Sequence, residues 1–128
     1  MGNISKGAAG EVLAARFLRD KGYEITHANY RCRFGEIDII ARDCPYFVFV
    51  EVKTRRADAL YAPAEAVTRE KQLRLIKSAG YFLLDETEEG QPRFDVIEVV
   101  LRPDDPLTAA EIRHLENAFG MDDLHGAF

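Results

Sequence analysis

Two carboxylates stand inside runs of aliphatic residues, where an unpaired charge is costly. Asp38 lies in the segment Gly-Glu-Ile-Asp-Ile-Ile (35–40), and Glu51 lies in Phe-Val-Glu-Val-Lys (49–53). Burial of a carboxylate is unfavourable unless a cation compensates it. Side chains alternate between the two faces of a β-strand, so Lys53 shares a face with Glu51. These positions therefore predict a small ionic cluster on one face of a sheet.

The cluster has the composition of a site for a hard divalent cation, Mg²⁺ or Mn²⁺. Mg²⁺ prefers an octahedron of oxygen ligands and takes only one or two protein carboxylates, with water and phosphate filling the rest. Asp38 and Glu51 are the candidate carboxylate ligands, and the Val52 carbonyl is a further candidate. Lys53 is suited to orient water or to stabilise the charge that develops on a phosphate. An ion pair at a sheet edge is the alternative that the spacing alone leaves open.

A β-hairpin is predicted to bring the two carboxylates together. Residues 36–41 and 46–53 are rich in Ile, Val and Phe, as strands are, and Pro45 falls in the turn between them. Asp38 and Glu51 are 13 positions apart, a separation that lets a hairpin place both near the same end of the strand pair. This hairpin is the element expected to build the site.

The rest of the chain is predicted to fold around the hairpin. The other predicted elements are, in order, a helix over 5–21, a strand over 23–30, a basic turn over 31–35, a loop over 54–62, a long helix over 63–84, an acidic loop over 85–92 and a strand over 94–101. The first three strands are expected to form an antiparallel meander, and the long helix to cross over to a parallel fourth strand. The sequence thus predicts an α/β fold with a central mixed sheet flanked by helices, in the order α-β-β-β-α-β.

The final segment, 108–119, carries two conflicting signals. Thr108 and Glu111 have the spacing of a capping box, which favours a helix. Ile112 and His114 are also spaced as in a short edge strand. The sequence leaves both structures open here.

Composition predicts one folded domain over residues 1–128. The length suits a single domain, and 47% hydrophobic with 30% charged residues is the balance of a globular protein. Two cysteines exclude a disulfide scaffold, and no apolar run reaches the roughly 18 residues of a membrane helix. The first residues lack the apolar core of a signal peptide, so we expect a cytoplasmic protein with no membrane partner.

Charge is divided unevenly along the chain. The net charge is −5, but residues 1–77 carry +4 and residues 78–128 carry −9. DNA would be attracted to the first part, although an ordinary solvated acidic tail gives the same asymmetry. Five basic side chains near the expected site are the candidate phosphate contacts, namely Arg31, Arg33, Arg55, Lys71 and Arg74. A solvated basic face is the alternative for these residues.

Two further acids are interpreted from their neighbours. Glu11 lies among alanines that permit close approach to a sheet, so a role in the site and a solvated position both fit. Asp95 follows Arg93 by two residues and is expected to form a structural ion pair with it. The spacing of His and Cys does not match a zinc site, and no glycine-rich phosphate loop follows a strand.

The combined motifs resemble those of the PD-(D/E)xK nuclease superfamily, and more closely those of its YraN family. The resemblance rests first on the segments 35–40 and 49–55 and on Gly10-Glu11 in the first helix. Shorter matches are Ala28-Asn29-Tyr30-Arg31, Glu65-Ala66-Val67 with Lys71 and Arg74, Arg93-Phe94-Asp95-Val96 and Glu116-Asn117-Ala118-Phe119. Nearly the whole chain is covered. The resemblance implies a restriction-endonuclease-like fold, similar to that of archaeal Holliday-junction resolvases.

The same resemblance implies an activity. It assigns metal binding and activation of water to Asp38, Glu51 and Lys53, with Glu11 completing the site. The implied function is Mg²⁺- or Mn²⁺-dependent hydrolysis of DNA phosphodiester bonds, and the resolvases extend it to branched or structured DNA and to a homodimer. The segment 60–62, Leu-Tyr-Ala, departs from the Phe-Gly common in the family. A non-catalytic nucleic-acid-binding or protein-interaction module that keeps the nuclease fold is the alternative.

Overall fold

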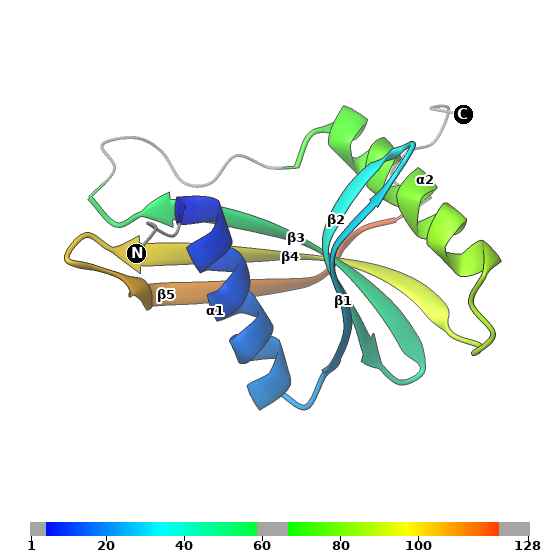
Figure 1. Cartoon of the computed structure of the whole chain (residues 1–128), viewed down its shortest axis with the longest axis horizontal. Coiled ribbons are helices and arrows are strands. Elements are labelled where there is room, and N and C mark those ends of the chain that lie inside the picture. Colours follow the sequence, from blue (N-terminus) through cyan, green and yellow to red (C-terminus); the bar gives the residue numbers. More distant parts are fainter. Residues whose placement is uncertain (1–4, 59–66, 121–128) are drawn as a thin grey trace.

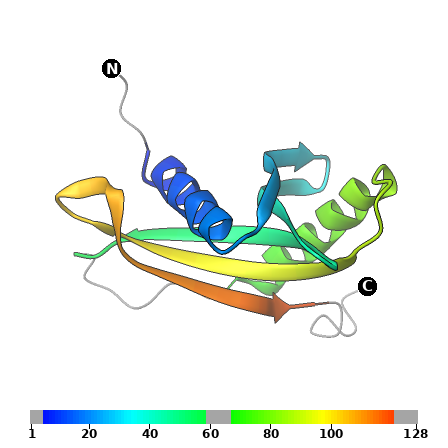
Figure 2. The ribbon, with the colours of Figure 1, turned by 90° about the horizontal axis from the view of Figure 1, so that it is seen from below.

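A five-stranded sheet carries one helix on each face (Figures 1 and 2). The computed structural model describes residues 5–58 and 67–120 of the chain. The elements are α1 (Lys6–Asp20), β1 (Glu24–Cys32), β2 (Gly35–Asp43), β3 (Tyr46–Arg56), α2 (Arg69–Leu84), β4 (Gln91–Arg102) and β5 (Asp105–Phe119). The segment Leu60-Tyr61-Ala62 and Glu65 lie outside the described residues, as does the first part of the helix expected from residue 63.

The strands lie in the order β1-β2-β3-β4-β5. β3 and β4 run parallel, and the other three neighbouring pairs run antiparallel. α2 connects the two parallel strands, because a parallel pair needs a crossover rather than a tight turn. The expected mixed sheet, its antiparallel meander and its parallel fourth strand are therefore confirmed.

The final segment is a strand rather than a helix. β5 runs antiparallel along the outer edge of β4, where its main-chain groups pair with those of β4. Thr108 does not cap a helix, because its hydroxyl donates to the Asp105 carboxylate over 2.6 Å. Pairing with the open edge of β4 thus takes precedence over the capping signal.

Two other boundaries differ from the expected ones. α2 begins at Arg69, because the Thr68 side chain caps it by accepting from the Lys71 N–H over 3.2 Å. Residues 67 and 68 therefore precede the helix. β3 continues to Arg56, three residues beyond the expected end, because its parallel pairing with β4 extends to Leu101.

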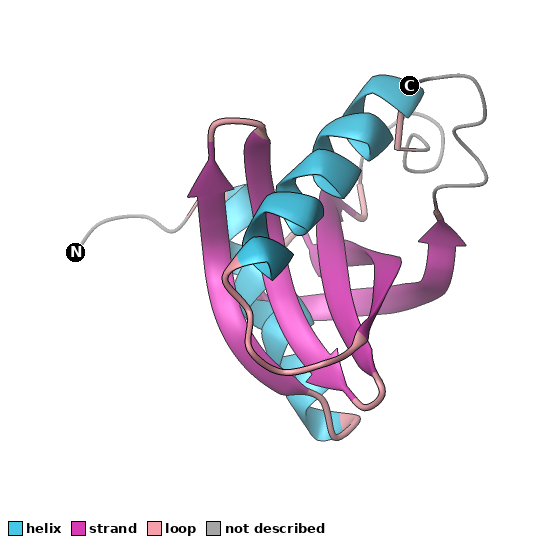
Figure 3. Cartoon of the chain, turned by 90° about the vertical axis from the view of Figure 1, so that its right-hand side faces the viewer, coloured by secondary structure: helices cyan, strands magenta, loops and turns pink. Residues whose placement is uncertain are grey.

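The sheet separates two hydrophobic clusters. One lies under α2 and includes Phe47, Phe49 and Phe82. The other lies under α1 and includes Leu18, Val48 and Val50. Figure 3 shows α2 over one face of the strands with α1 behind them. Neither described helix is long and apolar enough to cross a membrane.

Candidate active site

The candidate site lies where β2 and β3 separate. Their paired register ends at Ile39 opposite Val50, and its continuation would bring Ile37 opposite Val52. The Val52 N–H donates instead to Asp38 Oδ2 over 2.8 Å. Ile37 turns away and packs in the cluster under α2. The Asp38 carboxylate thus occupies the gap. It accepts the hydrogen bond from the Val52 N–H that a main-chain carbonyl of β2 would accept if the pairing continued.

Asp38 and Glu51 meet at this gap as two incompletely compensated acids. Burial raises the pKa of Glu51 to about 7, and the nearby Asp38 carboxylate adds to the rise. Burial also raises the pKa of Asp38, although the hydrogen bond from Val52 opposes the change. The Asp38 charge therefore destabilises the charged form of Glu51, and the Glu36 charge destabilises that of Asp38, which is the electrostatic situation that a bound cation relieves.

The kind and number of these oxygen donors suit a magnesium-type ion rather than an all-protein metal cage. Within residues 5–58 and 67–120, no three His, Cys, Asp or Glu side chains converge closely enough to hold a metal ion by themselves. Mg²⁺ does not require such a cage, because one or two carboxylates with water suffice. The N–H and C=O of one strand residue point to the same neighbouring strand, so the Val52 carbonyl also faces the gap that Asp38 occupies. Asp38, Glu51 and Val52 are therefore a chemically suitable donor set.

Lys53 and Lys71 supply positive charge to the two acids. Lys53 follows Glu51 by two residues on β3, and Lys71 comes from the first turn of α2. The charge of each lysine lowers the pKa of both Asp38 and Glu51, against the larger effect of burial. Lys53 thus lies near both carboxylates, as expected. Lys71 was predicted only as a DNA contact, but its charge also acts on both carboxylates.

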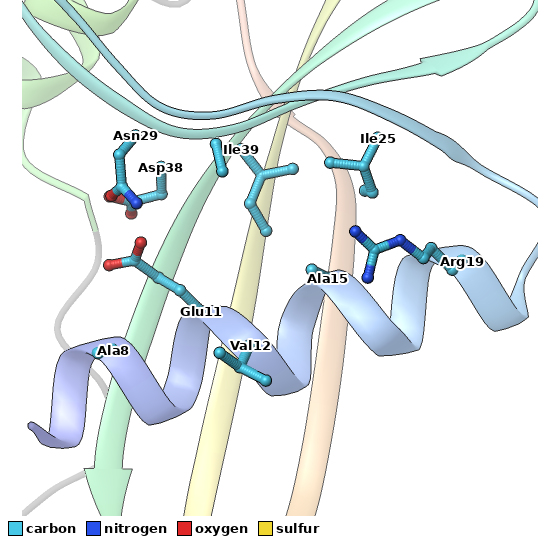
Figure 4. A pocket seen from close by; sticks show the side chains of 10 residues that line it. Ala8, Glu11, Val12, Ala15, Arg19, Ile25, Asn29, Asp38 and Ile39 are labelled. Carbon is cyan, nitrogen blue, oxygen red and sulfur yellow. The ribbon is translucent and has the colours of Figure 1, made fainter. Parts of the chain in front are cut away.

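Glu11 reaches the site because α1 lies very close to β3. A Cβ added at Gly10 would overlap the Thr54 side chain, so only glycine permits this approach. Burial raises the pKa of Glu11, and the charges of Asp38 and Glu36 add to the rise. Figure 4 shows the Glu11 carboxylate facing Asp38 from the helix. Glu11 from α1 therefore approaches Asp38 of β2, which in turn lies beside Glu51 of β3.

Asn29 joins this cluster, although its sequence context did not predict it. Its amide nitrogen, when oriented toward the acids, donates to Glu11 Oε1 over 2.7 Å and to Glu36 Oε1 over 3.1 Å. Its φ of 53° lies in the left-handed region, which Asn adopts more readily than most residues. The segment 28–31 contributes to the family resemblance, but nothing in the sequence points to this bridging role.

The expected phosphate contacts are distributed around the site. Arg74 lines a pocket of about 220 Å³ with Asp38, Glu51 and Lys71, and it pairs with Glu70 over 2.6 Å. The remaining three lie farther away, Arg31 on β1, Arg33 in the turn between β1 and β2, and Arg55 on β3. Arg31 pairs with Glu36 over 3.6 Å, Arg33 lies over the Phe34 ring, and half-buried Arg55 follows Lys53 on the same face of β3. Arg31, Arg33 and Arg55 line neither of the pockets that border Asp38.

A second buried acid, Asp95 on β4, is fully compensated. It accepts two hydrogen bonds from Arg93, at 2.9 and 2.8 Å, and one from the Asn117 N–H at 2.9 Å. His114 Nε2 lies 2.7 Å from Asp95 Oδ2. Arg93 also donates to the Tyr23 hydroxyl over 2.7 Å. The expected structural pair between Arg93 and Asp95 is therefore present, as the centre of a larger network.

Comparison with known proteins identifies relatives along most of the chain. The model of a family described as "Uncharacterised protein family UPF0102" matches residues 10–99. A UPF0102 protein of Syntrophus aciditrophicus is 48% identical over 120 residues, which cover 93% of this chain and 91% of the relative. A UPF0102 protein of Caldanaerobacter subterraneus is 44% identical over 88% of this chain and 93% of the relative. A third, from Nocardia farcinica, is 52% identical over 76% of this chain and 77% of the relative. These names state no activity, substrate or cofactor.

Proposed function

The chain belongs to the uncharacterised protein family UPF0102, the YraN family of the sequence resemblance, and we propose that it is a metal-dependent DNA endonuclease. The observation that carries the proposal is the pair of incompletely compensated carboxylates, Asp38 and Glu51, at the gap between β2 and β3. Lys53 supplies an ammonium beside both acids. Two carboxylates for a metal ion and an ammonium for phosphate charge are a combination suited to phosphodiester hydrolysis.

Asp38 and Glu51, with the Val52 carbonyl, would hold Mg²⁺ or Mn²⁺. When bound, the ion supplies polarisation of the phosphoryl group and neutralises its developing charge. Glu11 faces Asp38 from α1 and is held there by the Asn29 amide. We assign to Glu11 the positioning of water or of the ion, because its carboxylate is directed at Asp38.

The reaction is the addition of water to a DNA phosphodiester. The water oxygen forms a bond to phosphorus, one phosphorus–oxygen ester bond breaks, and the proton released by water ends on the departing oxygen. Lys53, whose charge lies near Glu51, would donate a hydrogen bond to the negative charge that gathers on the phosphate. The pocket bordered by Glu51, Lys71 and Arg74 gives the phosphate access from the α2 side.

DNA would lie along the positively charged first part of the chain. Residues 1–77 carry +4, and the candidate phosphate contacts Arg31, Arg33, Arg55, Lys71 and Arg74 all belong to this part. Arginine and lysine contacts to phosphate fix position without reading sequence. Branched or structured DNA and a homodimer are carried over from the resemblance to the junction resolvases.

A cleavage panel tests the proposal. Duplex, single-stranded, flap and four-way DNA are incubated with Mg²⁺, Mn²⁺ or a chelator. We expect cleavage only with a divalent ion, and a loss of about 100-fold or more in Asp38→Asn and Glu51→Gln. Asp20→Asn is the matched control, because Asp20 is an exposed acid at the end of α1.

Two results would contradict the proposal. Equal cleavage by Asp38→Asn and the wild type would place the chemistry elsewhere. DNA binding by a wild type that cleaves no substrate in the panel would instead support the non-catalytic nucleic-acid-binding module.

A further inference from the structure

A groove on the α1 face leads away from the carboxylates. It has a volume of about 330 Å³ and lies between α1 and the hairpin of β1 and β2. Asp38 lines both this groove and the pocket on the α2 side, so the two openings meet at the same carboxylate. Figure 4 shows Glu11, Asn29 and Asp38 gathered at one end of the groove and Arg19 at the other.

The middle of the groove is apolar on two opposite sides. Val12 and Ala15 line it from α1, and Ile25 and Ile39 line it from the strands. Val12 is 51% exposed although it is a large aliphatic residue. Figure 4 shows Ala15 facing Ile25 and Ile39, with the Val12 side chain directed away from them, so the inner walls are aliphatic and form a slot suited to a flat, apolar-faced group.

Arg19 places a positive charge at the far end of the groove. Within residues 5–58 and 67–120, its guanidinium makes neither an ion pair nor a hydrogen bond. Glu11, Ala15 and Arg19 are spaced four residues apart and so line the same side of α1. About 12 Å of helix rise separates Glu11 from Arg19. The groove therefore runs from an acidic end, at Glu11 and Asp38, to a basic end at Arg19.

We propose that this groove binds one unpaired nucleotide of the DNA strand whose phosphate lies at Asp38 and Glu51. The base lies between the aliphatic walls, and Arg19 contacts a neighbouring phosphate. Proteins hold a nucleotide outside the duplex by stacking its base between aromatic or apolar side chains, and this groove offers the apolar kind. The inference rests on the proposed function and adds to it the form of the substrate.

The size of the groove argues for a single nucleotide. About 330 Å³ lies at the lower end of the range for small-molecule sites, which suits one base with its sugar and excludes a duplex. A base can reach the slot only if its strand is unpaired or is opened next to the cleaved phosphate. Single-stranded flaps and branch points are therefore the favoured substrates.

Two groove variants and one matched control test the proposal. Ala15→Phe fills the slot, and Arg19→Gln removes the charge at its far end. Arg16→Gln is the control, because Arg16 is an exposed residue of the same helix that does not line the groove. Fluorescence anisotropy compares a duplex carrying a flap with the same duplex without it, in Ca²⁺, a hard cation of the same charge as Mg²⁺, so that Asp38 and Glu51 do not repel the phosphate. A 2-aminopurine in the flap reports whether the base enters the slot.

We expect the wild type and Arg16→Gln to bind the flap substrate about tenfold more tightly than the plain duplex. Ala15→Phe should lose this preference and the 2-aminopurine signal while keeping its melting temperature, and Arg19→Gln should lose most of the preference. Equal binding of the two substrates by the wild type, or an unchanged preference in Ala15→Phe, would overturn the inference. A groove-dependent preference without any metal-dependent cleavage would overturn the nuclease proposal and leave the nucleotide site standing.

Discussion

Asp38 on β2 and Asp95 on β4 flank the same strand, β3, and the protein compensates their charges in opposite ways. Asp95 is fully buried, and burial alone would raise its pKa. Hydrogen bonds from His114 and Arg93 outweigh that effect and lower the pKa of Asp95. Asp38 accepts a hydrogen bond from the Val52 N–H, but burial outweighs it and the pKa of Asp38 is raised.

The difference separates a structural acid from an acid kept available for a ligand. The partners of Asp95 come from β4 and β5 and occupy both of its oxygens. Asp38 faces a second acid, Glu51, and two open pockets instead. Strongly perturbed acids in clefts are typical of functional sites, whereas paired acids hold elements together. The two regions should therefore respond in opposite ways to the same substitutions.

Removal of the structural acid should have the largest effect. Asp95→Ala leaves the Arg93 guanidinium buried without its main partner, and we expect the unfolding free energy to fall by about 3–5 kcal/mol. Asp38→Ala should change it far less, because the loss of one hydrogen bond is offset by relief of the repulsion from Glu51. Urea denaturation measures both. Equal destabilisation of the two variants would remove the distinction between the regions.

Lys53→Ala should separate cleavage from binding. We expect single-turnover cleavage to fall by about 100-fold or more, the scale of losing one preorganised donor to transition-state charge. DNA affinity should change little, because phosphate contacts are spread over several side chains. Lys77→Ala is the control, since Lys77 is an exposed residue of α2. A parallel fall of binding and cleavage would make Lys53 a phosphate contact only.

Stability without metal should fall as the pH rises. Glu51 binds its proton more tightly in the folded state, where its pKa is about 7, than at its ordinary value of 4.5. Its contribution is therefore intact below pH 4.5 and is lost as the pH rises through 7. Glu51→Gln should flatten this slope and stabilise the metal-free protein at pH 8 by about 1–2 kcal/mol, a value reduced for partial solvent contact. Asp95 has the opposite sign, so its contribution is lost in acid. A wild-type stability curve that is flat between pH 5 and 8 would contradict the raised pKa.

Divalent ions should stabilise the carboxylate site specifically. At ten times its dissociation constant, an ion that binds only the folded protein adds about 1.4 kcal/mol, or roughly 4 °C in melting temperature. Asp38→Asn should abolish this gain in stability. The folded fraction of Asp95→Asn should retain it. Differential scanning fluorimetry with Mg²⁺ or Mn²⁺, and with NaCl of equal ionic strength, measures the shift. Equal stabilisation of the wild type and Asp38→Asn would show that the ion binds at another site.

The smallest expected effect concerns the basic side chains around the site. Replacement of Arg31, Arg33 and Lys71 by Ala should lower the slope of log affinity against log salt by about one unit for each phosphate that is no longer neutralised. The same measurement on Arg102→Ala, an exposed arginine in the acidic part of the chain, is the control. An unchanged slope in the triple variant would place the DNA on another surface.

Much of the fold was predictable because three signals in the sequence agree: the spacing of apolar residues, the residues in the turns and the order of the elements along the chain. Ile, Val and Phe mark β2 and β3, Pro45 marks their turn, and the long helix between β3 and β4 forces a parallel pair. β5 was ambiguous because its apolar residues fit two periods. Only the open edge of β4, a tertiary feature, decides between them.

The site was predictable in its residue types but not in its shape. Asp38, Glu51 and Lys53 are conspicuous because charged residues interrupt aliphatic strands. The separation of β2 from β3 was not visible, because uniform alternation along both strands conceals where pairing stops. Asn29 was not predicted for a related reason, since its left-handed backbone and its amide contacts depend on the neighbouring helix.

The hydrogen bond between Val52 and Asp38 makes one backbone amide a reporter of the site. A ligand that draws the Asp38 carboxylate toward itself competes for the oxygen that accepts this amide proton. Occupation of the site should thus appear as a changed amide resonance and faster hydrogen exchange at Val52. Val50, one step back in the paired register, should keep its slow exchange. The amide at the end of the β2–β3 pairing therefore reports whether the site is occupied, and NMR can detect this without any assay of cleavage.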